Sequence, residues 1–310
     1  MSRLPIVVLS LLGFAFVLAG CQSTGTAFNP PGGVTTFKHM YLSNDAVSGE
    51  IFVYGLPVTA ASTPVATVSA GTNPGELFVD SSGRLFVPQF SSTVPEVLVY
   101  NLPLTASSTP AFTLSTSQDA PESVAQDSSG NIYVADTDSG GYIDIYHGPV
   151  NGAASPSATI SNNAVGNSGL KDPYDIAIAP NGDLYASDFD DINQFTPPFT
   201  AASVPSASAA PNQDNYGLRV DSNNRVFVAN ASADGILNVY TQPFTNASTP
   251  VFNISVSGTY LYGMAFDGSG NLWTVDDNGV VWEIKAPITS SSTATQILTG
   301  TTGYGIVFGP

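Results

Sequence analysis

The residues best suited to ligand chemistry are tyrosines and carboxylates that recur at one position in a series of similar segments. Three segments have Tyr-Gly there, and the other three carry an acidic side chain at one of the same two sites. A tyrosine ring has a flat apolar face and a polar tip, which suits stacking on sugars or capping of peptides. Grouped carboxylates repel one another unless they are protonated, paired or bridged by a cation. The set comprises Tyr174, Tyr216, Tyr262 and Tyr304, with Glu76, Glu122 and Asp175.

A divalent metal is one way to bring such carboxylates together. Glu76 or Glu122, with Asn215 and Asp175, could hold a cation, and Ca²⁺ is the only cofactor that these hard oxygen ligands suggest. Acidic residues also keep a surface soluble, and Tyr-Gly could simply pack one repeat on the next, so both alternatives stay open. The predicted neighbouring loops add Asp136, Asp138, Asp188, Asp190, Asp191, Asp234, Asp276 and Asp277.

Two repeated sequence motifs define the strands and turns that position these residues. One is a turn followed by a strand, as in Asp80–Val87, Asp127–Val134 and Asp267–Thr274. The other is an alternating strand followed by a proline. Four short strands in each unit of about 40–50 residues are typical of β-propellers. We therefore expect an all-β fold, a six-bladed β-propeller with four-stranded blades. The prolines lie 44 to 49 residues apart, at Pro57, Pro103, Pro149, Pro198, Pro243 and Pro287.

The two ends of the predicted ring complement each other. The first unit starts at Phe37 without the strand that should precede Tyr41, and the chain ends in Gly303–Pro310, which matches the inner strand in Tyr262–Asp267. The carboxyl-terminal strand should therefore pair into the first blade. Loops that enter the inner strands and loops that join second to third strands share one face of a propeller, so the tyrosines and carboxylates should surround one mouth of the channel.

Residues that every repeat shares are expected to serve the fold. Asp80, Asp127, Asp221 and Asp267 stand before Gly or Asn and are interpreted as turn formers rather than catalytic carboxylates. The fourth repeat departs most from the pattern, with an insertion around 161–171 that could shape a pocket.

The first 20 residues are predicted to be a lipoprotein signal peptide. An apolar run over 6–18, too short to span a bilayer comfortably, ends in Leu-Ala-Gly-Cys21, which resembles a bacterial lipobox. An ordinary secretory signal is the alternative. We expect lipidation of Cys21 and cleavage before it, a flexible tether over 21–36 rich in Gly and Pro, and the propeller over 37–310. The expected location is the cell envelope, outside the cytoplasm, at the outer membrane or the cell surface. The lipid would make the membrane a partner of the protein.

The amino-acid composition limits the classes of partner that the protein can bind. The chain has 310 residues, 43% of them hydrophobic, with 7 Lys and Arg against 24 Asp and Glu and a net charge of −17. This balance argues against nucleic acid, because affinity for phosphate depends on cationic side chains. A single cysteine rules out an internal disulfide. We expect a monomer.

Tyr262–Asp276 (YGMAFDGSGNLWTVD) and Val124–Asp136 (VAQDSSGNIYVAD) resemble NHL-type repeats. More widely, the chain from Phe37 to Pro310 resembles the six-bladed propellers that include SMP-30/gluconolactonase-like and streptogramin-lyase-like proteins. This resemblance implies the fold, whereas its members include hydrolases, lyases and binding scaffolds. An SMP-30-like hydrolase would use Glu, Asn and Asp at the mouth to hold a cation and activate water. A lyase-like reaction would need a histidine base there, but His39 and His147 are predicted to lie elsewhere.

The favoured function is a noncatalytic, lipid-anchored module that binds a protein, peptide or glycan of the envelope. The alternative is a Ca²⁺-dependent lactonase or esterase with its site at the channel mouth. A structural scaffold without a small ligand is the third class.

Overall fold

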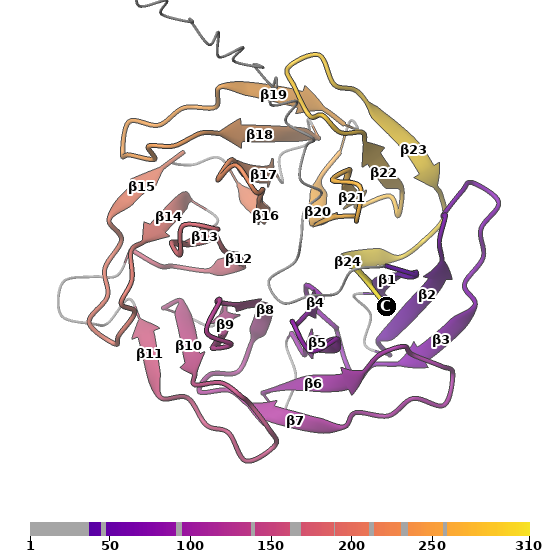
Figure 1. Ribbon diagram of the computed structural model, residues 1–310, viewed down its shortest axis with the longest axis horizontal. Coiled ribbons are helices and arrows are strands. Elements are labelled where there is room, and N and C mark those ends of the chain that lie inside the picture. Colours follow the sequence, from indigo (N-terminus) through magenta and orange to yellow (C-terminus); the bar gives the residue numbers. More distant parts are fainter. Residues whose placement is uncertain are drawn as a thin grey trace, which may run out of the picture.

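A computed structural model describes residues 37–44, 48–90, 95–137, 140–161, 169–188, 190–210, 214–230, 235–256 and 259–310. Within these ranges the chain forms 24 strands in six four-stranded antiparallel sheets, which surround a common axis (Figure 1). The predicted six-bladed β-propeller is confirmed. The predicted signal peptide, Cys21 and the tether lie outside the described residues. Among the residues that the model describes, no helix has the length and apolar character needed to cross a membrane.

Each blade is ordered outward from the axis. In five blades the four strands follow one another along the chain, and in the closing blade β24 lies inside three consecutive strands. The inner strands run from one face to the other along the axis. They are β4 (Phe78–Val79), β8 (Pro121–Gln126), β12 (Pro173–Ile178), β16 (Asn215–Val220), β20 (Leu261–Phe266) and β24 (Gly303–Gly309).

The second strands return antiparallel to the inner ones and carry the aromatic residue of the first repeated motif. These aromatics, Tyr41 among them, are at most 5% exposed, so they belong to the core. The second strands are β1 (His39–Asn44), β5 (Arg84–Pro88), β9 (Ile132–Asp136), β13 (Leu184–Asp188), β17 (Val226–Asn230) and β21 (Leu272–Asp276).

In five blades the third strand ends near the aromatic residue that precedes the repeated proline, and in the last blade it ends at Ile284. The third strands are β2 (Glu50–Gly55), β6 (Glu96–Asn101), β10 (Tyr142–Tyr146), β14 (Asp191–Phe195), β18 (Ile236–Tyr240) and β22 (Val281–Ile284). The outer strands are β3 (Ala66–Ser69), β7 (Phe112–Ser115), β11 (Ala158–Ser161), β15 (Ala207–Ala209), β19 (Phe252–Ser255) and β23 (Ala294–Leu298).

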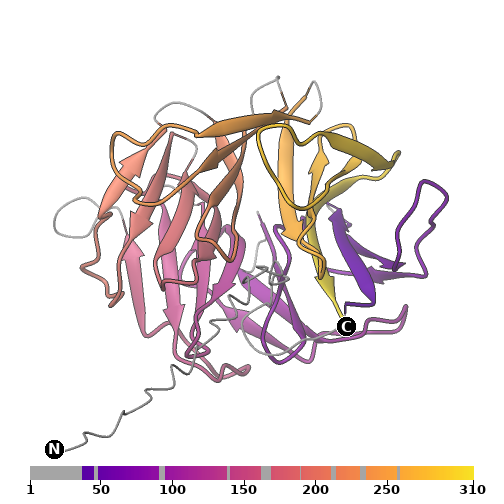
Figure 2. The same cartoon turned by 45° about the horizontal axis from the view of Figure 1, so that its top comes forward.

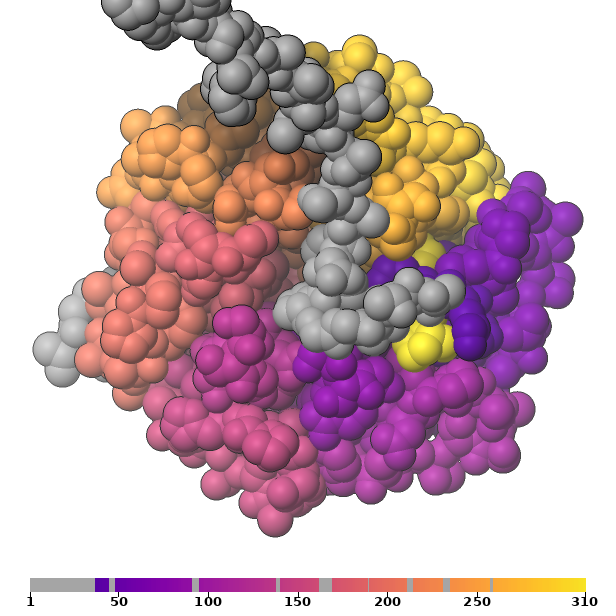
Figure 3. All heavy atoms as spheres, viewed as in Figure 1, coloured from indigo at the N-terminus to yellow at the C-terminus, as the bar shows by residue number. Residues whose placement is uncertain are grey.

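Ring closure occurs as predicted, between the two ends of the described chain. Strand β24 pairs antiparallel with β1, with His39 opposite Gly309 and Leu42 opposite Ile306. Figure 3 shows the yellow carboxyl-terminal residues against the indigo residues of the first blade. Each hydrophobic cluster draws residues from adjacent blades, so a blade buries its faces only against its neighbours.

The repeated aspartates have the structural role predicted for them. Asp80 Oδ1 accepts hydrogen bonds from the backbone N–H groups of Ser82 at 2.9 Å and Arg84 at 2.8 Å. Asp127, Asp221 and Asp267 accept the equivalent pairs of hydrogen bonds. These bonds fix the turn between the inner and second strands.

The propeller has two distinct faces. We call the one where the inner strands begin, marked by Tyr174, Tyr216, Tyr262 and Tyr304, the tyrosine face. We call the opposite one, which carries the Asp-x-x-Gly turns, the turn face. The carboxyl terminus lies on the turn face, toward the lower side of Figure 2.

Ile306 contributes to the stability of the closed ring. It is fully buried on β24, in the cluster with Met40 and Leu42 of β1. Ile306→Ala is expected to lower the free energy of unfolding by about 2–5 kcal/mol, because a cavity forms where the ring closes. Val251→Ala, at a side chain that is 54% exposed, should change it by less than about 0.5 kcal/mol. Urea unfolding measures both; equal effects would contradict this account of closure.

Candidate functional site

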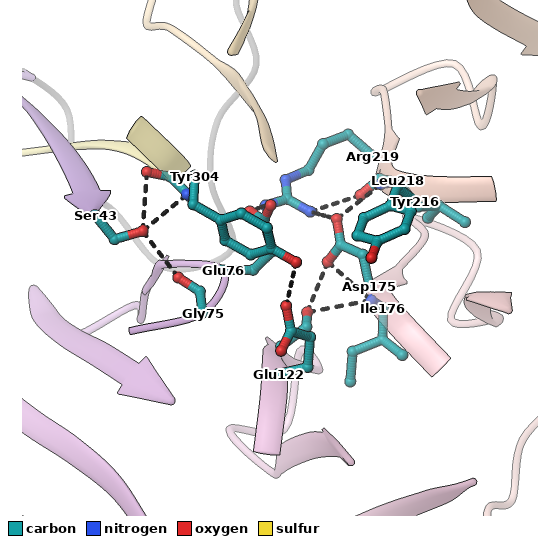
Figure 4. A network of polar contacts seen from close by, with 12 residues as sticks. Ser43, Gly75, Glu76, Glu122, Asp175, Ile176, Tyr216, Leu218, Arg219 and Tyr304 are labelled. Carbon is teal, nitrogen blue, oxygen red and sulfur yellow. Dashed lines mark hydrogen bonds and ion pairs between the residues drawn. The ribbon is translucent and has the colours of Figure 1, made fainter. Parts of the chain in front are cut away.

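The four tyrosines form a continuous arc around the mouth of the channel. The Tyr174 and Tyr216 rings stack with centroids 4.1 Å apart, Tyr216 and Tyr262 are 5.6 Å apart, and Tyr262 and Tyr304 are 5.1 Å apart. All four side chains are partly exposed. The Tyr304 hydroxyl donates a hydrogen bond to Glu122 Oε1 (Figure 4). These five side chains therefore lie side by side, as the sequence predicts, whereas their role in binding a ligand stays a prediction.

The glycine of the Tyr-Gly pair has a packing role. A Cβ atom on Gly217 would lie 2.2 Å from the carbonyl oxygen of Tyr262, and one on Gly305 would lie 2.7 Å from that of Gly75. A Cβ on Gly263 would also lie 2.6 Å from Glu76 Oε1. The inner strands thus approach so closely around the axis that only glycine fits, whereas the tyrosine beside it remains available to a ligand.

Below the tyrosines, the carboxylates meet around one guanidinium group. Arg219 of β16 forms ion pairs with Asp175 and, at 3.4 Å, with Glu76 (Figure 4). Asp175 also accepts hydrogen bonds from Ser123 Oγ at 2.6 Å and from the backbone N–H groups of Leu218 at 2.7 Å and Ile176 at 2.9 Å. Both carboxylates are at most 4% exposed. We call Arg219, Asp175 and Glu76 the axial ion cluster.

Burial sets the protonation of these groups. It raises the pKa of Glu76 well above its usual range, and the Asp175 charge adds to this, whereas Arg219 opposes it. Burial also raises the pKa of Asp175, against the lowering effects of Arg219 and the N–H donors. The pKa of the Tyr304 hydroxyl rises for the same reason, with Glu122 adding to the shift. The Tyr304 hydroxyl is therefore a neutral hydrogen-bond donor at physiological pH.

The residues suggested as metal ligands are arranged differently from that hypothesis. Glu76 and Asp175 face the guanidinium rather than an open coordination position, and Asn215 donates from Nδ2 to the carbonyl oxygen of Ala210 at 3.3 Å. Among the residues that the structure describes, no three His, Cys, Asp or Glu side chains are grouped as metal ligands. A positive charge does bridge the carboxylates, but it belongs to Arg219.

The loop aspartates of the tyrosine face mainly hold the loops themselves. Asp136 accepts the backbone N–H of Ala120 at 3.1 Å, and Asp276 accepts the N–H groups of Asn278 and Val280 at 3.0 and 2.9 Å. Lys171 pairs with Asp190. Asp138, Asp234 and positions 162–168 of the predicted insertion lie outside the described residues.

Sequence reasoning missed Arg219. The signal was present, because Arg219 is the single basic residue on any of the six inner-strand segments. The histidines lie where they were predicted, away from this mouth: His39 Nδ1 lies 2.9 Å from the carbonyl oxygen of Pro310 on the turn face.

Basic side chains are divided unequally between the two faces, and the turn face carries acidic ones as well, at Asp80, Asp127, Asp183, Asp221, Asp267 and Glu283. Of the described lysines and arginines, Lys171 alone lies on the loops of the tyrosine face, whereas Lys38, Arg84, Arg225 and Lys285 lie at strand ends on the turn face. The loops and strand ends of the tyrosine face carry Asp119, Glu122, Asp136, Asp172, Asp188, Asp190, Asp191, Asp214, Asp276 and Asp277.

Comparisons with known proteins support the fold alone. No family model and no curated protein matches the chain. A solved protein of unknown function from Bacteroides caccae is similar at a TM-score of 0.65 and 10% identity, over 88% of this chain and 99% of that one. One from Desulfotomaculum acetoxidans gives 0.61 and 11% over 88% of each chain. The WD40 β-propeller domain of Doa1 gives 0.57 and 11%, over 92% and 94%.

The axial ion cluster predicts a strong effect for Arg219→Met, which leaves two buried carboxylates without their counter-ion. We expect a loss of about 3–5 kcal/mol in the free energy of unfolding at pH 7. Without the cation the pKa values of Glu76 and Asp175 rise further, so protonation relieves the repulsion and the loss shrinks at pH 5. Urea unfolding at both pH values tests this. Adding Glu76→Gln and Asp175→Asn should restore stability, and a small, pH-independent loss would contradict the account.

Titration of Asp188 should make the free energy of unfolding depend on pH. Burial raises the pKa of this carboxyl to about 6, although the N–H of Lys171 lowers it. A carboxyl that binds its proton more tightly in the folded than in the unfolded chain stabilises the fold at low pH. This stabilisation is lost as the pH rises through the folded pKa. Between pH 4 and 7, Asp188→Asn should remove a decline on the order of 2 kcal/mol. Asp119→Asn, at an exposed side chain, should leave that decline in place.

Proposed function

We propose that this protein is a noncatalytic, lipid-anchored binding module of the bacterial cell envelope whose tyrosine face binds a basic segment of an envelope protein. The observation that carries this proposal is the partly exposed arc of four tyrosines within a rim of aspartates and glutamates.

The chemistry of the rim favours a cationic partner. Lysine and arginine side chains are attracted to the faces of tyrosine rings, and a rim of one sign of charge steers and orients a partner of the opposite sign. The ring edges and hydroxyls also suit main-chain amides. A neutral glycan would use the aromatic faces but would gain little from the acidic rim, so a basic polypeptide is the better match.

Binding rather than catalysis fits the state of the carboxylates. Asp175 accepts from four donors, Glu76 pairs with Arg219, and Glu122 accepts from Tyr304. A general base or a water-activating metal site needs oxygen atoms that face the substrate. The lactonase alternative would require these contacts to break first.

Lipid anchoring rests on the sequence. The Leu-Ala-Gly-Cys21 motif and the apolar run before it support export and acylation, and the repeats fit a divergent branch of the NHL and SMP-30-like propellers. Acyl chains on Cys21 would tether the propeller to the membrane, and more than one chain makes such an anchor stable.

Metabolic labelling tests the anchor. Cells that express the protein are grown with an alkyne-bearing palmitate, and we expect the wild-type chain to incorporate the label and to sediment with membranes. Cys21→Ser should abolish both because the acylated thiol is gone. Label that persists in Cys21→Ser, or unlabelled soluble wild-type protein, would contradict the proposed anchor.

Photo-crosslinking tests the binding face. A photoreactive amino acid replaces Tyr174 in one strain and Ser291, on the loop after β22 at the opposite face, in another. We expect a discrete adduct with a basic envelope protein at position 174 alone, weakened several-fold by Asp190→Asn with Asp191→Asn and by Tyr262→Ala. A glycan adduct, or equal adducts at both positions, would overturn the proposed partner.

A further inference from the structure

A second potential site lies at the other end of the channel. A cavity of about 420 Å³ opens between the inner strands on the turn-face side of the axial ion cluster. Residues from all six inner strands line it, so it lies within the ring and on its axis. The volume falls in the range of sites that hold small molecules, and the proposed binding at the tyrosine face makes no use of it.

The walls of this cavity are mainly apolar. Four phenylalanines line it, and the alanines at 125, 177 and 265 keep it open where the other inner strands carry larger side chains. From the inner strands, Arg219 is the one charged residue that lines it, and Asp175 and Glu76 already neutralise its side chain. The inner end therefore offers no unpaired cation to a ligand's acid group. At the turn-face mouth the lining also includes Asp80, which pairs with Arg84, and Asp127, which accepts hydrogen bonds from Asn131 and Tyr133. The phenylalanines are Phe37, Phe78, Phe266 and Phe308.

The length of the segment between Cys21 and the cavity limits how far the cavity can lie from a lipid anchor. Phe37 lines the cavity and directly follows residues 21–36, which connect it to Cys21. Even fully extended, this segment reaches only about 50 Å. An anchor at Cys21 therefore keeps Phe37, and with it the cavity entrance, within about 50 Å of the lipid surface.

The exposed lysines also favour an orientation with the turn face toward the membrane. Lys38 and Lys285 are exposed on the turn face, where they can contact anionic headgroups. The acidic tyrosine face is repelled by an anionic surface and turns away from it. The apolar cavity is complementary to the apolar chain of a lipid, and the exposed Lys38 and Lys285 can contact its anionic head beside the aspartates of the turns.

We propose that this cavity binds one acyl chain of a membrane lipid, with the methyl end toward the axial ion cluster and the headgroup at the turn face. The orientation argument rests on the proposed lipid anchor at Cys21, whereas the fit of an acyl chain rests on the cavity alone.

Dodecanoate is the probe for the cavity. Because all described strands and the ring closure lie within 39–309, the chain from Gln22 onward contains the whole described core and serves without its lipid. Titration calorimetry should show saturable binding of one dodecanoate, and Ala177→Leu and Val307→Phe, which fill the cavity from two strands, should each weaken it at least tenfold. Ala61→Leu, at an exposed loop position, should leave it unchanged.

Melting curves for each variant distinguish loss of the cavity from loss of the fold. A folded wild-type protein that binds no dodecanoate, or binding that both filled variants retain, would overturn the cavity as an acyl site. Neither result depends on Cys21 or on the tyrosine face, so either can occur while the proposed function stands.

Binding to lipid vesicles shows whether the acyl chain comes from a membrane lipid. The same unlipidated protein should sediment with phosphatidylglycerol vesicles, and Ala177→Leu should reduce the bound fraction several-fold. Binding of dodecanoate without any binding to vesicles would contradict a membrane lipid as the occupant and indicate a soluble fatty acid instead.

Discussion

The pairing of Arg219 with Asp175 and Glu76 is the interaction on which the functional arrangement of this propeller depends. Six inner strands converge on an axis too narrow for side chains at several positions, so glycines accept the neighbouring backbone there. Two buried carboxylates in this space would repel each other strongly. One guanidinium on β16 joins Asp175 of β12 and Glu76, just before β4, electrostatically and makes the buried charges compatible with a closed ring.

The axial ion cluster also divides the channel. On one side lie the stacked tyrosines and their acidic rim. On the other lies an apolar cavity whose face carries most of the described basic side chains outside the channel. One fold thus presents two surfaces of opposite chemistry, and we infer that one looks toward a basic protein and the other toward the membrane.

The sequence was sufficient for the fold and for the neighbourhood of the site, but not for its pairings. Repeated motifs define strands and turns locally, which is why the aspartate turns, the tyrosine arc and the pairing of β24 with β1 were predictable. The contact between Arg219 and Glu76 joins residues 143 positions apart across the axis, and no local pattern encodes it. The hypothesis of a metal among Glu76 or Glu122, Asp175 and Asn215 stays a prediction, and it did not include Arg219, the cation that pairs with two of these carboxylates. The cavity was missed because its alanines and phenylalanines read as ordinary core residues in a strand.

The most direct test of this division is the orientation of the lipidated protein on a membrane. A fluorophore can be attached through an introduced cysteine at Ser269 on the turn face or at Asn278 on the tyrosine face, both exposed positions of one blade. Vesicles that carry a quencher in their headgroups then report which label lies near the lipid. The account predicts strong quenching at position 269 and little at 278, whereas equal quenching or the reverse order would contradict it.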